Sequence, residues 1–321
     1  MLSHNYINQQ KGKAMTIKDN FKSFESLDKT LKLLDVSLEE MQQAINKGYR
    51  RYKTFKNGKF RWIEEPNDEL KIIQQKLLLY LQNNLECPTY CTAGFKGQNN
   101  IKNAEKHRNK REVLTMDISH YFPNTQEKYV RKIFSEFIGV DDNVLNLLVK
   151  ITTFNGYLPT GAATSTILSC FVHKEIFDNI FKKMKSLDID MTVYVDDITL
   201  STHKHISNWV ISHINNSLQS HGLFLKKSKI KRYGYKHAVV TGVHIAQSGK
   251  MSAPFKIGHS AICALCDKDL KQMSLTELRK IIVKISYIQQ FNPLKMIKVK
   301  KQAIKQLKKL QKISANKNER I

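Results

Sequence analysis

Residues 191–201, with the sequence MTVYVDDITLS, decide the fold of this chain. β-Branched and aromatic residues flank the adjacent pair Asp196 and Asp197, a composition that predicts two short strands joined by a tight turn. Neither strand propensity nor turn geometry requires two neighbouring aspartates, and their like charges repel each other. A pair of Mg²⁺ ions would neutralise them, because Mg²⁺ prefers hard oxygen ligands. The alternative is a solvated Asp-Asp turn, which is common in hairpins.

Composition indicates a folded protein with a polyanionic partner. The 321 residues are 41% hydrophobic, enough for one large domain or a few small lobes with a real core. Lys and Arg total 53 against 28 Asp and Glu, a net charge of +25 that favours nucleic acid or an anionic membrane surface as partner. Five cysteines, an odd number, argue against a disulfide framework. Without a membrane-length apolar stretch or the apolar core of a signal peptide, we expect a cytoplasmic protein without membrane association.

The rest of the chain predicts helices and strands in an α+β order. A polar segment covers residues 1–20. A capping box at Ser37–Glu40 begins a helix, and an Asn57-Gly58 turn predicts a hairpin over 49–63. Helices are also expected over 70–85, from Asn124 towards Phe137, from Thr164 as one long helix, over 205–220, and from Ser274 onward. Strands are expected over 113–118 and as a pair or bend over 239–245.

The strand over 113–118 carries Asp117 near its carboxyl end. If this strand lies beside the hairpin in one antiparallel sheet, Asp117 comes close to Asp196 and Asp197. Three converging carboxylates are unfavourable unless cations neutralise them. Two metal ions held there would support an in-line displacement at a phosphate, with pyrophosphate leaving.

The C-terminal segment is strongly basic. Residues 295–321 contain ten lysines and arginines against one acidic residue, Glu319, and apolar residues recur at near-helical spacing. A lysine-faced helix that only packs on the core is one interpretation. The overall charge favours a helix that lies along a nucleic-acid backbone, with Lys298, Lys301, Lys305 and Lys308 as contacts.

The motifs together resemble the palm of the reverse transcriptases over most of residues 45–250. The matching pieces are DISHYF (117–122), LPTGAATS (158–165), YVDD (194–197), GLFLKKSK (222–229) and VTG (240–242). Two pieces are similar to blocks of the bacterial retron enzymes: NAEKH (103–107) and the VTG segment. The compact length, without an appended maturase or nuclease domain, also agrees with that group.

The resemblance implies a right-hand polymerase: an α+β fold with a ferredoxin-like palm, fingers and a helical thumb. The expected divisions are an N-terminal helical extension (1–45), part of the fingers (46–112), the palm with a fingers insertion (113–250) and a basic helical thumb (251–321). The implied activity is RNA-directed DNA synthesis on the enzyme's own structured non-coding RNA, primed from a guanosine 2′-OH to give the branched RNA–DNA hybrid msDNA. An effector protein encoded nearby and a role in anti-phage defence are further expectations.

The same resemblance assigns site residues. Asp117, Asp196 and Asp197 become catalytic ligands of two Mg²⁺ ions, for which Mn²⁺ can substitute, with the carbonyl of Ile118 as a further ligand. The deoxynucleoside triphosphate is expected to meet the steric-gate ring of Phe122, its neighbour Tyr121, Arg61, Thr160, Gly161 and Lys229. Lys226 and Lys227 are alternatives to Lys229, and Lys53 or Lys59 is a further candidate for phosphate contact beside Arg61. Arg61 suits phosphate through its fork of donors. The RNA is expected to meet Asn103, His107, Val240, Thr241, Gly242 and the four C-terminal lysines, although structural roles are an alternative for the first five.

One segment departs from the family pattern. Thr160 stands where the family usually has a glutamine, and two prolines of that motif are absent from residues 160–166. This departure keeps a second hypothesis open, a catalytically weak RNA-binding scaffold. A third hypothesis is another bacterial reverse transcriptase, of defence or group II intron ancestry.

Overall fold

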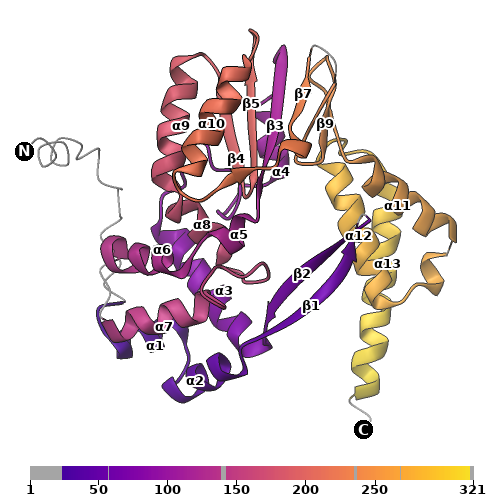
Figure 1. The fold of residues 1–321 in the computed structure, drawn as a ribbon. Coiled ribbons are helices and arrows are strands. Elements are labelled where there is room, and N and C mark those ends of the chain that lie inside the picture. Colours follow the sequence, from indigo (N-terminus) through magenta and orange to yellow (C-terminus); the bar gives the residue numbers. More distant parts are fainter. Residues whose placement is uncertain (1–23, 57, 139–141, 235–236, 268, 319–321) are drawn as a thin grey trace, which may run out of the picture. The chain divides into compact units, whose positions relative to one another are not determined.

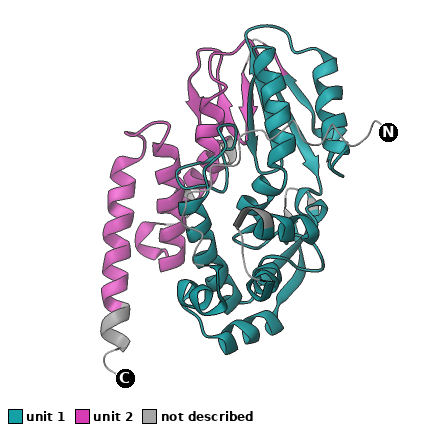
Figure 2. Ribbon diagram, turned by 90° about the vertical axis from the view of Figure 1, so that its left-hand side faces the viewer, with its two compact units in different colours: residues 1–99, 114–232 teal, residues 100–113, 233–321 magenta. Residues whose placement is uncertain are grey.

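The computed structural model describes residues 24–56, 58–138, 142–234, 237–267 and 269–318 (Figure 1). The predicted polar N-terminal segment and Asn57 of the hairpin turn lie outside these residues. The chain divides into two compact units, which Figure 2 colours separately. Unit 1 comprises residues 1–99 and 114–232, and unit 2 comprises residues 100–113 and 233–321. The boundaries predicted for fingers, palm and thumb stay a prediction.

The sheet of unit 1 is built around the predicted aspartate strands. Its order is β4 (Asp190–Tyr194), β5 (Asp197–Thr202), β3 (Glu112–Ser119) and β6 (Phe224–Leu225), and β7 (Lys231–Tyr233) also pairs with β3. β4 and β5 are antiparallel, with Tyr194 opposite Asp197, so the turn between them holds Val195 and Asp196. The hairpin and the strand over 113–118 are therefore confirmed, and they lie side by side as expected.

Helices cover this sheet, and a separate hairpin precedes it along the chain. The helices of unit 1 are α1 (Leu27–Leu34), α2 (Leu38–Lys47), α3 (Asp68–Asn84), α5 (Tyr121–Asn124), α6 (Glu127–Lys132), α7 (Asp142–Thr152), α8 (Ser165–Val172), α9 (Lys174–Ser186) and α10 (Asn208–Gln219), with a π-helical segment over 133–138. β1 (Tyr49–Lys56) and β2 (Lys59–Pro66) form the predicted two-stranded hairpin. The capping box at Ser37 and Glu40 is present at the start of α2. Apolar side chains from the helices and the sheet form one continuous core.

Two helix predictions were wrong in detail. The helix expected from Asn124 begins at Glu127, because residues 121–124 form the short helix α5 and the Thr125 hydroxyl donates to the Tyr121 carbonyl. The long helix expected from Thr164 is two helices that meet at His173. The His173 ring is buried against Tyr121 and hydrogen-bonds Thr125 Oγ1 at 2.9 Å, so side-chain contacts that periodicity does not report occupy the break.

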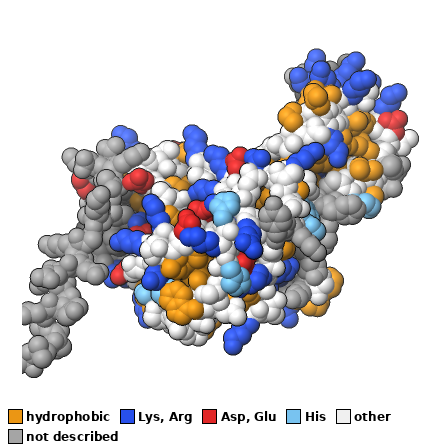
Figure 3. Space-filling view, turned by 90° about the horizontal axis from the view of Figure 1, so that it is seen from above, with side chains coloured by type: hydrophobic (Ala, Val, Ile, Leu, Met, Phe, Trp, Pro, Cys, Tyr) orange, Lys and Arg blue, Asp and Glu red, His pale blue; other side chains and the backbone are white. Residues whose placement is uncertain are grey.

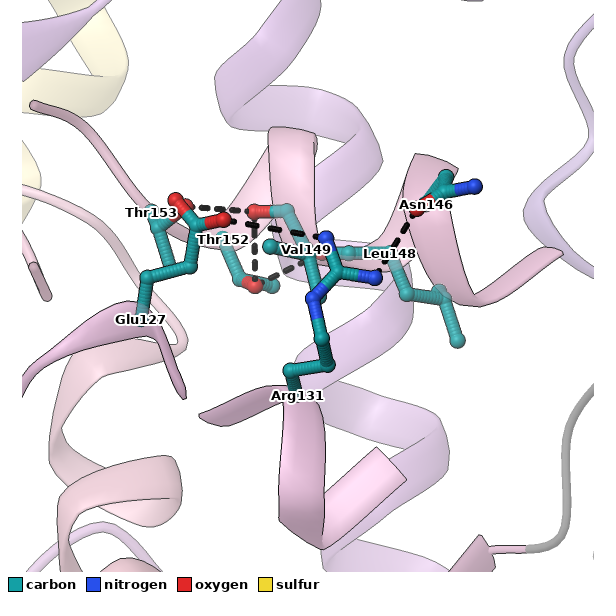
Figure 4. A network of polar contacts seen from close by, with 7 residues as sticks. All are labelled: Glu127, Arg131, Asn146, Leu148, Val149, Thr152 and Thr153. Atoms are coloured by element: carbon teal, nitrogen blue, oxygen red, sulfur yellow. Dashed lines mark hydrogen bonds and ion pairs between the residues drawn. The ribbon is translucent and has the colours of Figure 1, made fainter. Parts of the chain in front are cut away.

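A polar network joins α6 to α7 and to Thr153 just after it (Figure 4). Thr153 Oγ1 donates to Glu127 Oε2 at 3.2 Å and to the Val149 carbonyl at 2.8 Å. Arg131 lies 3.7 Å from Glu127 and donates to Asn146 Oδ1 at 2.8 Å. The network fixes the start of α6, and α5 immediately precedes it along the chain.

Unit 2 combines a small sheet with helices. Its elements are α4 (Asn100–Glu105), β8 (Ala238–Val240), β9 (Val243–Ile245), β10 (Met251–Ser252), α11 (Phe255–Asp267), α12 (Leu275–Gln289) and α13 (Ile297–Asn318). The sheet order β10-β9-β8 confirms a strand pair over 239–245. One apolar cluster joins α4 to this sheet, and another joins α11, α12 and α13. Across the described ranges of both units, no helix has the length and apolar character needed to cross a bilayer.

Candidate active site

Backbone hydrogen bonds bring the three predicted aspartates to one edge of the sheet. The Ile118 N–H donates to the Asp196 carbonyl at 2.8 Å, which joins the strand of Asp117 to the turn of the hairpin. The Asp117 carbonyl accepts from the Lys226 N–H at 2.8 Å, which brings the 222–229 segment to the same edge. Val195 has φ +60°, a left-handed conformation that is rare for a β-branched residue, so the fold holds this turn under strain.

The electrostatics of this edge are those of crowded carboxylates. Burial, and then the nearby Asp117, raise the pKa of Asp196. Burial, with Asp196 and Asp117 next in importance, raises the pKa of Asp197 to about 7. Lys229 opposes both shifts, and its ammonium donates directly to Asp117 Oδ1. The raised pKa values of these two carboxyl groups indicate that the site contains too little positive charge to balance its carboxylates.

This donor set suits Mg²⁺. Among the described residues, no three Asp, Glu, His or Cys side chains are gathered closely enough to enclose an ion by themselves. Mg²⁺ in polymerase sites does not need such a cage, because it binds through one or two carboxylates and completes its shell with water and substrate phosphates. Here Lys229 provides the positive charge at Asp117, so ion binding at Asp117 would compete with this lysine. Ile118, which follows Asp117 in β3, has a buried side chain.

We expect Asp197→Asn to stabilise the metal-free protein, and the gain to depend on pH. A carboxyl whose folded-state pKa is raised from 3.8 to about 7 makes the native state less stable as pH rises between these values. Removing that charge should therefore raise the free energy of unfolding by about 1–3 kcal/mol above pH 7. The gain should vanish near pH 4. Urea unfolding in EDTA across this range measures it, and a gain independent of pH would contradict this account.

The residues predicted to hold the nucleotide differ in accessibility. Arg61 is exposed on β2, and its positive charge acts to lower the pKa of Asp196. Phe122 is half-buried at the start of α5. Tyr121 is buried, and its hydroxyl donates to the Ser169 carbonyl at 3.3 Å, so it supports the site from within the core. Thr160 and Gly161 are exposed in the loop before α8.

Glu64 is a supporting residue that the sequence did not indicate. Its side chain is buried on β2, accepts from the Tyr157 hydroxyl at 2.6 Å and lies 3.4 Å from the Thr160 N–H. It thereby ties the hairpin to the loop of Thr160 and Gly161. In the sequence, Glu64 is one of two adjacent glutamates before Pro66. Such a pair is typical of a charged surface, and only the contact with Tyr157 distinguishes Glu64 from exposed glutamates.

Gly161→Ala should disturb this junction. A Cβ at Gly161 would overlap the Glu64 carbonyl oxygen and lie 3.0 Å from its carbon, so backbone must move. We expect a loss of about 1–3 kcal/mol in unfolding free energy, as for other overpacked sites. We also expect a higher KM for the nucleotide. Gly258→Ala is the control, because a Cβ there meets nothing within 4 Å. Equal effects of both variants on KM and unfolding would contradict this role.

The two blocks with retron resemblance meet inside unit 2. Asn103 Nδ2 donates to Thr241 Oγ1 at 3.2 Å, and Asn100 Nδ2 donates to the Thr241 carbonyl at 3.2 Å and to the Tyr287 hydroxyl at 2.8 Å. Thr241 has φ +45° in the turn between β8 and β9. Asn103, His107 and Val240 are buried, which favours an architectural role over direct RNA contact for these three. Gly242 is exposed at the turn.

The predicted basic helix is α13. Its residues Lys298, Lys301, Lys305 and Lys308 are exposed, and their spacing places them along one face of the helix. Ala303 is buried, and Val299, Leu307 and Leu310 pack on the cluster with α11 and α12. The helix is therefore amphipathic, and its apolar side is covered in part, since Ile297 and Ile313 remain exposed. Basic side chains also recur over the face of the molecule drawn in Figure 3, where acidic ones are fewer.

Comparisons with known proteins identify the family. The family model described as reverse transcriptase (RNA-dependent DNA polymerase) matches residues 45–245. The retron Se72 reverse transcriptase of Salmonella heidelberg is 28% identical over 213 residues, 64% of this chain and 56% of that protein. The retron Ec48 reverse transcriptase of Escherichia coli is 26% identical over 226 residues, 64% of this chain and 55% of that protein.

The retron Ec86 reverse transcriptase of Escherichia coli is 28% identical over 156 residues, 48% of each protein. The aligned part of this chain thus spans about half the length of these relatives. The family match covers more than half of the chain and includes every predicted catalytic aspartate. The prediction of the family is confirmed: the chain belongs to the reverse transcriptases, and bacterial retron enzymes are among its relatives.

Proposed function

We propose that the chain is a Mg²⁺-dependent reverse transcriptase of the retron type. It copies its own structured non-coding RNA into DNA, priming from a 2′-OH to give branched msDNA. The observation that carries this proposal is the meeting of Asp117, Asp196 and Asp197 with Lys229 at one sheet edge, inside the segment that matches the family.

In this proposal, each side chain of the site has its own role in nucleotidyl transfer. Asp117, Asp196 and Asp197 would hold two Mg²⁺ ions, which supply Lewis-acid stabilisation of charge on the reacting phosphate. Lys229, which hydrogen-bonds Asp117, would give a proton or positive charge to the leaving pyrophosphate once it leaves Asp117. Arg61 binds the triphosphate from the hairpin, and the loop of Thr160 and Gly161 frames the nucleotide. The Phe122 ring excludes a ribose 2′-OH.

The proposal includes the cellular setting. The partners are the cognate non-coding RNA, its msDNA product, deoxynucleoside triphosphates and an effector protein encoded nearby, in a cytoplasmic anti-phage defence system. Support comes from the basic charge, the exposed lysines of α13 and the similarity to retron enzymes. An RNA-binding scaffold remains a second candidate because Thr160 replaces the family's glutamine beside the site.

Expression of the gene with its neighbouring non-coding region tests the proposal. A small branched DNA attached to RNase-sensitive RNA is expected from the wild type and not from Asp196→Asn. RNA binding without any such DNA would favour the scaffold. The same DNA from Asp196→Asn would contradict the catalytic assignment.

We expect the four lysines of α13 to contact RNA phosphates. The combined variant Lys298→Gln, Lys301→Gln, Lys305→Gln and Lys308→Gln should weaken RNA binding and lower the salt slope of log affinity by about 3. The control removes the same charge from exposed lysines of unit 1, with glutamine at Lys71, Lys128, Lys182 and Lys185. Filter binding between 50 and 300 mM KCl measures both. An equal loss from the control would show that only net charge matters.

A further inference from the structure

A buried glutamine of α3 joins three other segments of unit 1. Gln74 has no exposed surface. Its Nε2 donates to the Tyr49 hydroxyl at 2.6 Å and to the Ile151 carbonyl at 2.7 Å, and its Oε1 accepts from the Ala163 N–H at 3.3 Å. These partners fix the orientation of the amide, because a carbonyl can only accept and a backbone N–H can only donate. One side chain therefore links α3 to β1, to the end of α7 and to the loop before α8.

The contact with the loop before α8 is made at a tight turn. The Ser165 N–H donates to the Ala162 carbonyl at 3.3 Å, so Ala163 and Thr164 are the second and third residues of the turn. Thr164 has φ −83° and ψ −17°, values typical of the third position of a type I turn. Such turns favour proline at the second position, because its ring fixes φ in the required range. This chain has Ala163 there, and the N–H that a proline would lack is the group that donates to Gln74.

The turn directly follows the residues proposed to frame the nucleotide. Thr160 and Gly161 precede Ala163 in the same loop. The Thr160 N–H lies 3.4 Å from the buried Glu64 carboxylate, and the Ala163 N–H is held by Gln74. A buried side chain therefore holds the backbone on each side of Gly161. Without Gln74, the backbone between Gly161 and α8 would lose one of these two contacts.

We propose that Gln74 is a positioning residue for the incoming nucleotide. It acts through the Ala163 N–H to hold Thr160 and Gly161 in the conformation that frames the nucleotide. Being fully buried, it has no surface with which to touch the nucleotide itself. This inference rests on the proposed function, which places the nucleotide beside this loop. The alternative is a glutamine that only stabilises the core, and its loss would lower the amount of folded enzyme without changing KM.

Replacement of Gln74 by leucine tests the proposal from the side of α3. Gln74→Leu keeps the space filled and removes the hydrogen bond to Ala163. We expect KM for a deoxynucleotide to rise roughly tenfold in single-nucleotide extension, the size of one lost buried hydrogen bond, with kcat within about twofold of wild type. Gln82→Leu is the matched control, because Gln82 lies on the same helix and donates to the Gly94 carbonyl at 2.7 Å, outside this loop. Equal KM values in the two variants would overturn the proposal, as would a lower kcat with unchanged KM in Gln74→Leu.

Replacement of Ala163 by proline tests the same hydrogen bond from the side of the loop. The ring fits the second position of the turn but takes the place of the N–H that meets Gln74 Oε1. In the wild type, Ala163→Pro should raise KM, because it breaks the hydrogen bond and leaves a buried oxygen unpaired. In Gln74→Leu the same change should lower KM, because it removes an unpaired N–H and restricts the turn.

The sign of the proline effect decides between the two roles of Gln74. A change of KM in the same direction in both backgrounds, or in neither, would refute the link between Gln74 and Ala163. If Gln74→Leu does not fold, the wild-type background decides alone: Ala163→Pro must raise KM with kcat retained, and an unchanged KM would overturn the proposal.

Hydrogen exchange of the chain without substrates separates this inference from the proposed function. Backbone amides of residues 157–166 should exchange faster in Gln74→Leu than in the wild type, by on the order of tenfold, and Gln82→Leu should leave them unchanged. Unchanged exchange in Gln74→Leu would overturn the inference even where DNA synthesis is normal. If the wild type makes no DNA, the proposed function fails, while faster exchange in Gln74→Leu would still show that Gln74 fixes this loop.

Discussion

Asparagine at Asp117 or Asp196 is expected to lower primer extension by on the order of 10³-fold or more, with RNA binding retained. Each change removes a negative charge from the set that would hold the metal ions, without changing the size of the side chain. Binding should persist because the basic surface of α13 is untouched. The expected loss of extension rate is larger than for the other substitutions, because these aspartates would hold the metal ions that stabilise charge on the transferred phosphate.

Single-turnover extension on an RNA template, at saturating enzyme, measures that loss apart from binding. Asp188→Asn is the matched control, because Asp188 precedes β4 on the same hairpin and pairs with Lys204 at 3.4 Å. Its φ of +59° is one that asparagine adopts readily, so the change should leave both folding and extension near wild type. Equal extension rates of Asp196→Asn and Asp188→Asn would show that Asp196, in the turn between β4 and β5, has no catalytic role.

Phe122→Ala is expected to lower discrimination against ribonucleotides by about 10²-fold, the size found when an apolar pocket rejects one added hydroxyl. The half-buried ring at the start of α5 would otherwise occupy the space of the 2′-OH. The measurement is the ratio of kcat/KM for a deoxynucleotide to that for the matching ribonucleotide. Because the change also removes core contacts, it should cost some stability as well.

Phe181→Ala controls for that loss of packing. Phe181 is also partly buried on the core of unit 1, where its ring lies 5.4 Å from Tyr90. It should lower stability without altering sugar discrimination. If Phe122→Ala leaves the ratio of the two kcat/KM values unchanged, the Phe122 ring has only a packing role in the core.

Local patterns predicted the parts of the fold that local forces decide. β-Branched and aromatic residues on both sides of Asp196 and Asp197 predicted β4 and β5, and the capping box at Ser37 predicted the start of α2. The proximity of Asp117 required the further assumption that two strands are neighbours, which the hydrogen bond from Ile118 to Asp196 confirms. The net charge of +25 also predicted a polyanionic partner, and this part stays a prediction.

What the sequence did not predict depends on tertiary contacts. The break at His173 arises where its buried ring meets Thr125 and Tyr121, three residues that no periodicity connects. The sequence gives no reason to expect Glu64 to be buried, because its partners Tyr157 and Thr160 lie more than 90 residues away along the chain. For Asn103 in α4 and His107 just after it, the sequence left RNA contact and a structural role both open, and only the fold showed that the two side chains are buried.

The most direct test of the central claim is primer extension by the purified chain on an RNA template with deoxynucleotides. We expect Mg²⁺-dependent DNA synthesis that EDTA abolishes, that Mn²⁺ supports, and that falls by about 10³-fold in Asp196→Asn. Synthesis that continues in EDTA, or that Asp196→Asn performs at the wild-type rate, would contradict the assignment of Asp117, Asp196 and Asp197 as the metal-binding centre of a reverse transcriptase.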